Sequence, residues 1–379
     1  MTYPVLLIIN AGSSSVKFQL FSLDSDLISL ANGKIYNLGT EPAFTAVNEE
    51  LTTTEKKTLP QDCHHEQAIQ FILQWIEKQQ KHWEIAAVAH RIVHGGTLFT
   101  ESVLITPEIM QQLKKFISLA PLHQPHNLSA IEIITRINPK LPQIGCFDTA
   151  FHAQHTPLFS TYALPQHLRE QGIRRYGFHG LSYEWITHVL NKEHKNLIKG
   201  RIVTAHLGNG ASLCAMQNGI SIDTTMGLTA LDGLPMGTRC GSIDPGAITY
   251  MIRELKLSPE EVEQILYNDS GLLGLSGLTN DVKALQDSSN SQAQFSLDFF
   301  CLKVAQYVAM MAISLNGIDG IVFTGGIGEN SKIIRTNIID RLKSLQPFSV
   351  LIIPTNEEKM MAIHALAIIK SSQYVKKIY

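Results

Sequence analysis

Three turns rich in glycine each follow a short apolar run that predicts a strand. They span residues 10–17, 206–212 and 324–330. Glycine lets a backbone approach an anion closely, and serine or lysine adds donors or charge, so these turns suit phosphate groups. The Walker sequence G-x-x-x-x-G-K-[ST] and the dinucleotide fingerprint G-x-G-x-x-G are both absent. An ordinary hairpin or strand-to-helix turn explains any one of them, but three in one chain favour a nucleotide.

Arginine stands beside glycine and histidine in three further segments. Arg91 lies in residues 90–96, Arg174 and Arg175 open residues 174–180, and Arg239 lies in residues 236–241. The planar guanidinium binds carboxylate or phosphate oxygens with two parallel hydrogen bonds. An isolated arginine is most often a solvated surface charge, but only 17% of this chain is charged. The repeated pattern therefore favours an anionic substrate.

Two acidic positions could complete such a site. Asp148 closes the apolar run 143–147, where a strand-end carboxylate commonly faces a cleft, and an N-cap or turn aspartate is the alternative. Thr355 and Glu358 have the spacing of a capping box before the periodic stretch 360–369. That spacing predicts that Glu358 is occupied at the helix end and that Glu357 is the freer carboxylate.

The 15 histidines raise the alternative of a metal hydrolase. Candidate ligands are the pair His90 and His94, the run 63–65, and the pair His152 and His155. The zinc sequence H-E-x-x-H does not occur, and the G-x-S-x-G nucleophile elbow is also missing. These absences disfavour a zinc hydrolase and a serine hydrolase of the usual kinds.

The composition predicts a folded globular protein with more than one domain. The chain has 379 residues, 31 basic and 33 acidic, for a net charge of -2. At roughly 150 residues per domain this length suggests two or three domains. Because charge is low and nowhere concentrated, nucleic acid and anionic membranes are poor partners.

Localisation is predicted from apolar runs and cysteines. Apolar runs such as 5–9 and 85–89 are far shorter than the ~18 to 20 residues that cross a bilayer, so we expect no transmembrane helix. The N-terminus lacks a basic region and a cleavage site, so we expect no signal peptide. Five cysteines without a C-x-x-C pair indicate a reducing cytoplasm.

Short apolar runs alternate with segments of helical period, which predicts a layered α/β fold. Predicted strands are 4–10, 16–22, 85–89, 143–147, 202–206, 212–216, 320–323 and 348–353. Predicted helices are 66–80, 107–119, 128–137, 181–190, 360–369, and one that opens at the capping box of Ser258 and Glu261 and runs toward Tyr267.

One internal echo suggests a duplication. Residues 5–20 and 201–216 both predict a strand, a turn rich in glycine and serine, and a returning strand. Two similar halves would create a cleft between them, with residues 149–157 or 172–180 as the hinge. Chance recurrence of a common turn explains the echo equally well, so both interpretations stay open.

Taken in order, these motifs resemble the acetate kinase family, which belongs to the superfamily of sugar kinases, actin and the heat-shock chaperone ATPases. Nine segments between residues 10 and 358 carry the resemblance in the family's order. They are 10–17, 90–96, 120–123, 147–152, 175–180, 206–212, 236–240, 323–330 and 354–358.

The resemblance implies two duplicated actin-like (ribonuclease H-like) ATPase domains with ATP in an interdomain cleft. The first domain would span residues 1–150, joined by the last helix at about 360–379, and the nucleotide-binding second domain would span 151–359. It further implies a homodimer that phosphorylates acetate reversibly, with Mg²⁺ required and Mn²⁺ as a substitute.

The resemblance also assigns roles to individual residues. Arg91, Asp148, His179 and Arg239 would be catalytic, and Arg91, Val93, Leu122, His123 and Phe178 would bind acetate. Asn10 and Glu357 would hold the metal ion. The nucleotide would be bound by Ser13, Ser15, Lys17, His206, Leu207, Gly208, Asn209, Gly210, Asp281, Val282, Lys283, Gly326, Ile327, Gly328, Glu329 and Asn330.

The chain departs from the family pattern at three positions. Lys283 replaces a usual arginine, Ala230 replaces a frequent proline at the pocket rim, and Ser242 replaces a common aspartate. A propionate or butyrate kinase of the same family is the alternative function. Val93 narrows the acyl pocket and favours acetate, whereas Ala230 favours a larger acid.

Overall fold

The computed structural model describes residues 3–49, 51–79 and 83–371. The chain divides into two units after Ala150, which lies in the first of the two predicted hinge segments. Unit 1 comprises Met1–Ala150 with Asn356–Tyr379, and unit 2 comprises Phe151–Thr355. Residues 356–359, expected in the second domain, therefore belong to unit 1, and Glu357 goes with them.

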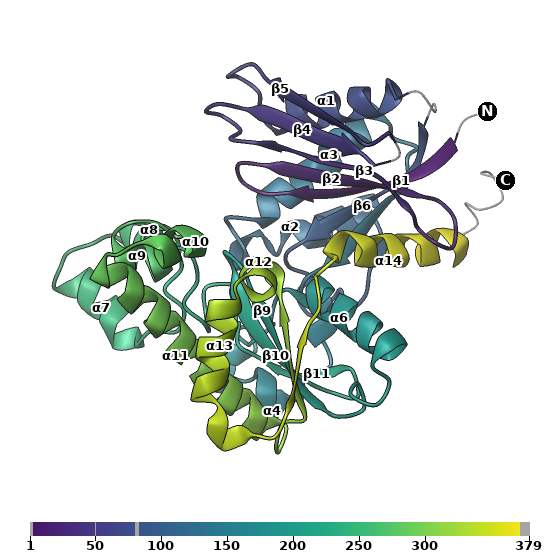
Figure 1. The fold of residues 1–379 in the computed structure, drawn as a ribbon. Helices are drawn as coiled ribbons and strands as arrows, with labels where there is room; N and C mark the ends of the chain where they lie inside the picture. The colour runs from purple at the N-terminus through teal and green to yellow at the C-terminus, as the bar shows by residue number, and fades with distance from the viewer. Residues whose placement is uncertain (1–2, 50, 80–82, 372–379) are drawn as a thin grey trace. The chain divides into compact units, whose positions relative to one another are not determined.

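Unit 1 is built on an eight-stranded sheet with the order β5-β4-β3-β2-β1-β6-β8-β7 (Figure 1). Successive strands from β1 to β5 pair antiparallel with one another. On the other side of β1, β6 pairs parallel with both β1 and β8. The strands are β1 (Tyr3–Ala11), β2 (Val16–Ser22), β3 (Ser29–Tyr36), β4 (Ala43–Asn48), β5 (Thr53–Thr58), β6 (Trp83–Ile92), β7 (Val103–Leu104) and β8 (Gln143–Phe147).

Helices cover both faces of this sheet. Ile69, Ile72, Trp75 and Ile76 of α1 form the expected apolar stripe and are buried with alternate residues of β1 and β2. On the other face, α14 contacts β1, β6 and β8. The helices are α1 (His65–Glu77), α2 (Pro107–Lys114), η1 (Ile117–Leu119), α3 (Gln124–Ile137) and α14 (Glu357–Ser371). The expected end of α1 at Gln80 lies outside the described residues, and α2 stops before the predicted Leu119.

Unit 2 repeats the same topology with five strands in the order β11-β10-β9-β12-β13. β9, β10 and β11 are antiparallel, and β9, β12 and β13 are parallel. Strands β3-β2-β1-β6-β8 of unit 1 have this order and these directions, so the two hairpins of the sequence echo are equivalent parts of a duplicated fold. The strands are β9 (Arg201–Leu207), β10 (Ala211–Gln217), β11 (Ile220–Thr224), β12 (Gly320–Thr324) and β13 (Ser349–Ile352).

In unit 2, α11 packs against β9, β10 and β11, and α9, α10 and α13 pack against α11. The capping box predicted at Ser258 is confirmed, because its hydroxyl accepts from the Glu261 amide at 3.1 Å and the Glu261 carboxylate accepts from the Ser258 amide at 2.7 Å. The helices are η2 (Ala150–His152), α4 (Pro157–Ser160), α5 (Gln166–Arg169), α6 (Gly180–Glu193), α7 (Pro245–Arg253), α8 (Pro259–Asn268), α9 (Gly271–Ser276), α10 (Val282–Asp287), α11 (Ser291–Ser314), α12 (Gly325–Asn330), α13 (Lys332–Arg341) and η3 (Lys343–Leu345).

Among the described residues, α11 is the one helix long and apolar enough to cross a membrane by length and composition. We expected no transmembrane helix because the uninterrupted apolar runs are short, and α11 reaches this length only because polar residues interrupt its apolar run without lowering its average hydropathy enough. Half of its most apolar window is buried in the protein. Buried residues such as Leu297, Phe300, Val304 and Val308 recur at helical spacing, as in the core helix of a soluble protein.

Candidate active site

Arg91 and Asp148 form the central ion pair of unit 1. Arg91 lies near the end of β6, and Asp148 directly follows the end of β8. Because these two strands are parallel neighbours, both residues lie at the same edge of the sheet. Arg91 Nη2 donates to Asp148 Oδ2 at 2.7 Å and Arg91 Nε donates to Oδ1 at 3.0 Å. Asp148 is therefore the partner of an arginine, and the pair does not use Arg91 Nη1.

A second carboxylate approaches the same guanidinium. Glu357 Oε2 lies 3.7 Å from Arg91 Nε. Burial alone would lower the pKa of Arg91, but the charges of Asp148 and Glu357 raise it above its ordinary value. The pKa of Glu358 is raised by burial and by the neighbouring charge of Glu357. The arginine therefore stays charged in a cluster that carries more negative than positive charge.

The predicted capping box at Thr355 and Glu358 was wrong. The Asn356 side chain accepts from the Lys359 amide at 2.9 Å and caps α14. Thr355 Oγ1 instead lies 2.8 Å from the hydroxyl of Ser182. The freer carboxylate expected at Glu357 is engaged by Arg91, a contact that sequence spacing does not reveal.

The first glycine-rich turn places Asn10 and Lys17 side by side. They are opposite each other in the register of β1 and β2, so their side chains share one face of the sheet. Ser13 is exposed and Ser15 is half-buried in the tight turn between them, which the bond from the Gly12 amide to the Ser15 carbonyl closes at 2.8 Å. Lys17 and Glu358 also line a cavity of about 380 Å³ on this face.

The segment that carries Val93 is held by buried polar side chains that the sequence analysis missed. The Val93 amide donates to Asn127 Oδ1 at 3.0 Å, and Gln124 bonds both the amide and the carbonyl of His94. Thr149 Oγ1 accepts from the Gly95 amide at 3.0 Å. Gln124 and Asn127 are uncharged polar residues inside the apolar stripe of α3. That pattern is the sequence signal that could have identified these two buried residues.

The remaining predicted acetate residues differ in exposure. Val93 is half-buried, Leu122 is exposed, and Phe178 of unit 2 is buried. His123 is the residue before the first turn of α3, and its amide donates to the Ala120 carbonyl at 3.1 Å.

In unit 2, His179 is held in a defined orientation. It has left-handed backbone angles at φ 58° and precedes α6. Its Nδ1 lies 2.9 Å from Ser212 Oγ, which also bonds the Tyr183 hydroxyl, and its ring stacks on His206 at 4.4 Å between centroids. His206 Nδ1 in turn lies 2.8 Å from the Ser182 hydroxyl.

Arg239 and His179 meet at the second glycine-rich turn. A Cβ atom added to Gly210 would lie 3.3 Å from His179 Nε2 and 3.8 Å from Arg239 Nη1. Arg239 Nη1 also donates to the Ala230 carbonyl at 3.0 Å. A histidine ring nitrogen and an arginine guanidinium therefore lie near the same short stretch of backbone.

The second and third glycine-rich turns lie at the carboxyl ends of the parallel strands β9 and β12. Gly325 has φ 78° and packs so closely that an added Cβ would lie 2.8 Å from the Leu207 carbonyl oxygen. Gly208 and Gly326 are adjacent across this edge. The carboxyl edge of a parallel sheet is a usual position for ligands of α/β proteins.

Several residues predicted to bind the nucleotide are buried or make hydrogen bonds within unit 2. Glu329 Oε1 accepts from the Gly325 and Thr355 amides at 2.8 and 3.0 Å. The Asp281 carboxylate caps α10 by accepting from the Lys283 amide at 2.8 Å. Leu207 and Val282 are buried, so only their backbone groups could reach a ligand. Asn209, Lys283, Gly326 and Asn330 are exposed, Gly208, Gly210 and Ile327 are half-buried, and Gly328 is buried.

Ser242 fits its position because Asp232 is its neighbour. Ser242 Oγ donates to Asp232 Oδ1 at 2.6 Å and accepts from the Tyr307 hydroxyl at 2.7 Å. An aspartate in place of Ser242 would bring two carboxylates together there.

Two observations concern the alternative of a metal hydrolase. The described residues contain no group of three or more His, Cys, Asp or Glu side chains arranged to hold a metal ion. His90 is instead buried, with Nε2 2.7 Å from Gln143 Oε1.

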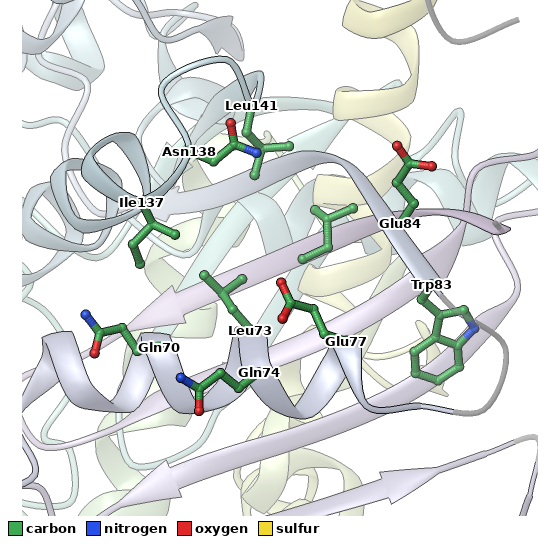
Figure 2. A pocket seen from close by; sticks show the side chains of 10 residues that line it. Gln70, Leu73, Gln74, Glu77, Trp83, Glu84, Ile137, Asn138 and Leu141 are labelled. Atoms are coloured by element: carbon green, nitrogen blue, oxygen red, sulfur yellow. The ribbon is translucent and has the colours of Figure 1, made fainter.

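A cavity of about 650 Å³ lies between α1, the end of α3 and the start of β6 (Figure 2), and none of the predicted site residues lines it.

The fold defines the chain as a protein with duplicated actin-like ATPase domains. A family model described as the acetokinase family matches residues 5–346, and the chain belongs to this family. The acetate kinase of Rhodopseudomonas palustris strain CGA009 is 46% identical over 89% of this chain and 86% of its own length. That of Nitrobacter hamburgensis is 41% identical over 98% of both chains.

Solved structures agree with this assignment. Porphyromonas gingivalis acetate kinase has a TM-score of 0.87 at 33% identity and covers 97% of this chain and 100% of its own. A propionate kinase from Francisella tularensis has a TM-score of 0.89 at 36% identity and covers 96% of this chain and 99% of its own.

Proposed function

We propose that the protein transfers the terminal phosphoryl group of ATP reversibly to acetate, giving acetyl phosphate and ADP. The observation that carries the proposal is the Arg91 guanidinium, which Asp148 orients through Nε and Nη2 while Nη1 takes no part in the pair. This group would bind the acetate carboxylate, with Val93, Leu122 and Phe178 around the methyl group and His123 close by. Membership of the acetokinase family and the acetate kinases at 41% and 46% identity support the choice of substrate.

The chemistry required of the protein is mainly positioning and charge stabilisation. A carboxylic acid with a pKa near ~4 is ionised at pH 7, so acetate needs no general base. Asp148 therefore acts by orienting Arg91. His179 and Arg239 would donate to the transferring phosphoryl group, and their common approach to Gly210 supports this pairing.

The nucleotide would bind along the glycine-rich turns. Lys17 would contact its phosphates, with donors from Ser13 and Ser15. Residues 206–210 and 326–330 would line it at the carboxyl ends of β9 and β12, together with residues 281–283. Lys283 is exposed and offers a single ammonium group where a planar guanidinium is usual.

The donors around Glu357 fit a magnesium ion. The amide of Asn10 and the carboxylate of Glu357 are the hard oxygen ligands that Mg²⁺ takes alongside water and phosphate. The excess of carboxylates, with the raised pKa of Glu358, favours a cation in this region. When bound, the ion would neutralise the nucleotide phosphates, and Mn²⁺ takes the same ligands. Glu357→Gln should raise the metal concentration needed for half-maximal ATP binding, measured by calorimetry.

A propionate kinase is the second candidate, favoured by the Francisella tularensis structure and by Ala230 at the pocket rim. Trapping the acyl phosphate with hydroxylamine, in the presence of ATP and Mg²⁺, tests both functions in one experiment. Acetate should give the highest kcat/KM. A higher value for propionate would reverse the order, and no hydroxamate from either acid would refute the proposal.

We infer a cytoplasmic homodimer. All five cysteines are free, as expected in a reducing compartment. On α11, Phe295, Leu302, Met310 and Ile313 form an exposed apolar stripe, of which Ile313 is 83% exposed. Contiguous exposed apolar surface of this kind favours burial against a second copy. Light scattering should give twice the 42.1 kDa chain mass, and Ile313→Glu should shift it toward the monomer.

A further inference from the structure

A buried hydrogen-bonded cluster in unit 2 lies next to the segment that carries His179. Ser221 of β11 is its centre, with Oγ 2.8 Å from His152 Nδ1 and 2.7 Å from His155 Nε2. Cys214 Sγ lies 3.2 Å from the same oxygen. All four side chains are buried, and the function proposed above uses none of them.

The partners determine where each proton lies. His152 Nε2 is 3.0 Å from the Phe178 carbonyl oxygen, which can only accept, so Nε2 carries the proton. Nδ1 must then accept from the Ser221 hydroxyl. That oxygen then accepts from His155 Nε2–H. The Cys214 thiol can donate to the same oxygen or to the Ala215 carbonyl oxygen, which lies 3.7 Å from Sγ. The partners of the two histidines therefore place a proton on Nε2 of each ring.

Both histidines are neutral near pH 7 in this arrangement. Burial, with a smaller contribution from the charge of Arg175, outweighs the bond to Phe178 and lowers the pKa of His152 to about 4. Burial, followed by His152 and the nearby arginines, lowers the pKa of His155 to about 3. A neutral His152 keeps Nδ1 as an acceptor, which the bond from Ser221 requires.

The bond to Phe178 acts directly on the backbone of His179. The Phe178 carbonyl and the His179 amide belong to one peptide plane, so holding the oxygen restricts the φ angle of His179. That angle is 58°, in the left-handed region that is strained for a non-glycine residue. Gly177, at φ 81°, bends the chain over the His152 ring, since an added Cβ would lie 2.7 Å from His152 Cδ2.

Strand β10 contacts both the His179 ring and the buried cluster that bonds the Phe178 carbonyl. Ser212 and Cys214 lie two residues apart on β10, so their side chains share one face of the sheet. Ser212 bonds the His179 ring, while Cys214 belongs to the cluster that holds its backbone. The ring and the backbone of His179 are therefore anchored separately to one rigid sheet.

We propose that His152 and Ser221 are positioning residues that hold His179 in the orientation it needs to donate to the transferring phosphoryl group. The inference rests on the function proposed above for His179. Neither residue touches the reacting atoms, and both act through the Phe178 carbonyl.

Two substitutions of His152 separate positioning from packing. His152→Leu removes the donor to Phe178, and His152→Gln keeps an N–H group near the position of Nε2. The leucine variant should lose about 10- to 100-fold in kcat because a small misplacement of a catalytic group is costly. The KM values for acetate and ATP should stay within about twofold. The glutamine variant should recover most of kcat.

One control variant tests general effects of altering the core. Thr204→Val changes a buried hydroxyl of β9 that has no hydrogen-bond partner, and it should keep kcat close to that of the parent protein. If the leucine variant does not fold, Ser221→Ala, which removes the donor to His152 Nδ1, should show the same selective loss of kcat.

A second measurement does not depend on activity. In protein labelled with ¹³C at histidine Cε1, the His179 signal, assigned with His179→Gln, should move in the leucine variant and return in the glutamine variant. If no variant makes acetyl phosphate but this shift occurs, the proposed function fails and the positioning of His179 stands. An unmoved His179 signal, equal losses in both His152 variants, or a change confined to KM would overturn the inference.

Discussion

Replacing Asp148 with asparagine should loosen Arg91 without changing the size of the side chain. Asp148 is 2% exposed and accepts two bonds from Arg91, at 2.7 and 3.0 Å. Asparagine keeps one oxygen, removes the charge, and presents an amide to a cation. Glu357, at 3.7 Å, would then be the nearest carboxylate to Arg91 and would draw the guanidinium toward itself.

The size of the effect follows from burial. A hydrogen bond to a charged group contributes about 1.5 to 3 kcal/mol, and breaking a buried ion pair costs up to about 5 kcal/mol. Because asparagine retains volume and one acceptor, we expect a loss of about 2 to 3 kcal/mol. In a domain of this size that lowers Tm by roughly 4 to 12 °C. The acetate KM should rise about 10- to 100-fold, since the carboxylate would meet a misdirected arginine.

Asp319→Asn provides a matched control in unit 2. Asp319 also forms a two-bond pair with an arginine, at 2.6 and 3.0 Å from Arg201, and this bonding lowers the pKa of Asp319 to about 2. Its side chain is 39% exposed and stands at the opposite end of β12 from the glycine-rich turn. Loss of this solvated pair should cost no more than about 1 kcal/mol and leave the acetate KM unchanged.

The assays are thermal unfolding and hydroxamate formation over a range of acetate concentrations. A large fall in kcat with an unchanged acetate KM and an unchanged Tm would contradict the orienting role of Asp148. That result would indicate proton transfer by Asp148 instead.

Three further predictions concern other parts of the molecule. His179→Ala should lower kcat by about 10² to 10³ with little change in acetate KM, and a defect confined to KM would make His179 a binding residue. Val93→Ala should raise the propionate-to-acetate ratio of kcat/KM by at most about 10- to 200-fold, and an unchanged ratio would show that Val93 does not limit acyl size. Burial lowers the pKa of His90 and His152 to about 4 and of His155 to about 3. Since the unfolded chain binds these protons near pH 6.5, stability should be full above that pH and fall toward pH 4, by about 2 kcal/mol per histidine at pH 5. Equal urea-unfolding free energies at pH 7 and pH 5 would contradict this.

Local sequence was sufficient for elements whose residues carry their own signal. β1, β2, β8, β9, β10 and β12 are apolar enough to be recognised without their neighbours, and each was predicted within a residue or two. The helix beginning at Pro259 was predicted from a capping box that needs only four consecutive residues. The predicted phosphate turns also follow from local sequence, because glycine at a strand end is informative by itself.

Elements that depend on pairing were missed. β5, with the sequence TTEKKT, is exposed at all six positions and is a strand only because β4 binds its edge. β3 contains Asn32, Gly33 and Lys34, which individually disfavour a strand. Hydrogen bonds to β2 and β4 outweigh that preference in the folded chain.

The chemical environment of the candidate residues was decided by the tertiary structure. The sequence contained Arg91, Asp148 and Glu357 as separate signals, but their ion pairs join residues 57 and 266 positions apart (148 − 91 and 357 − 91). Glu329 was predicted to bind nucleotide, and its carboxylate closes the turn at Gly325. A side chain's partners depend on distances that only the folded chain establishes, so residue type identifies the available chemistry and packing determines how it is used.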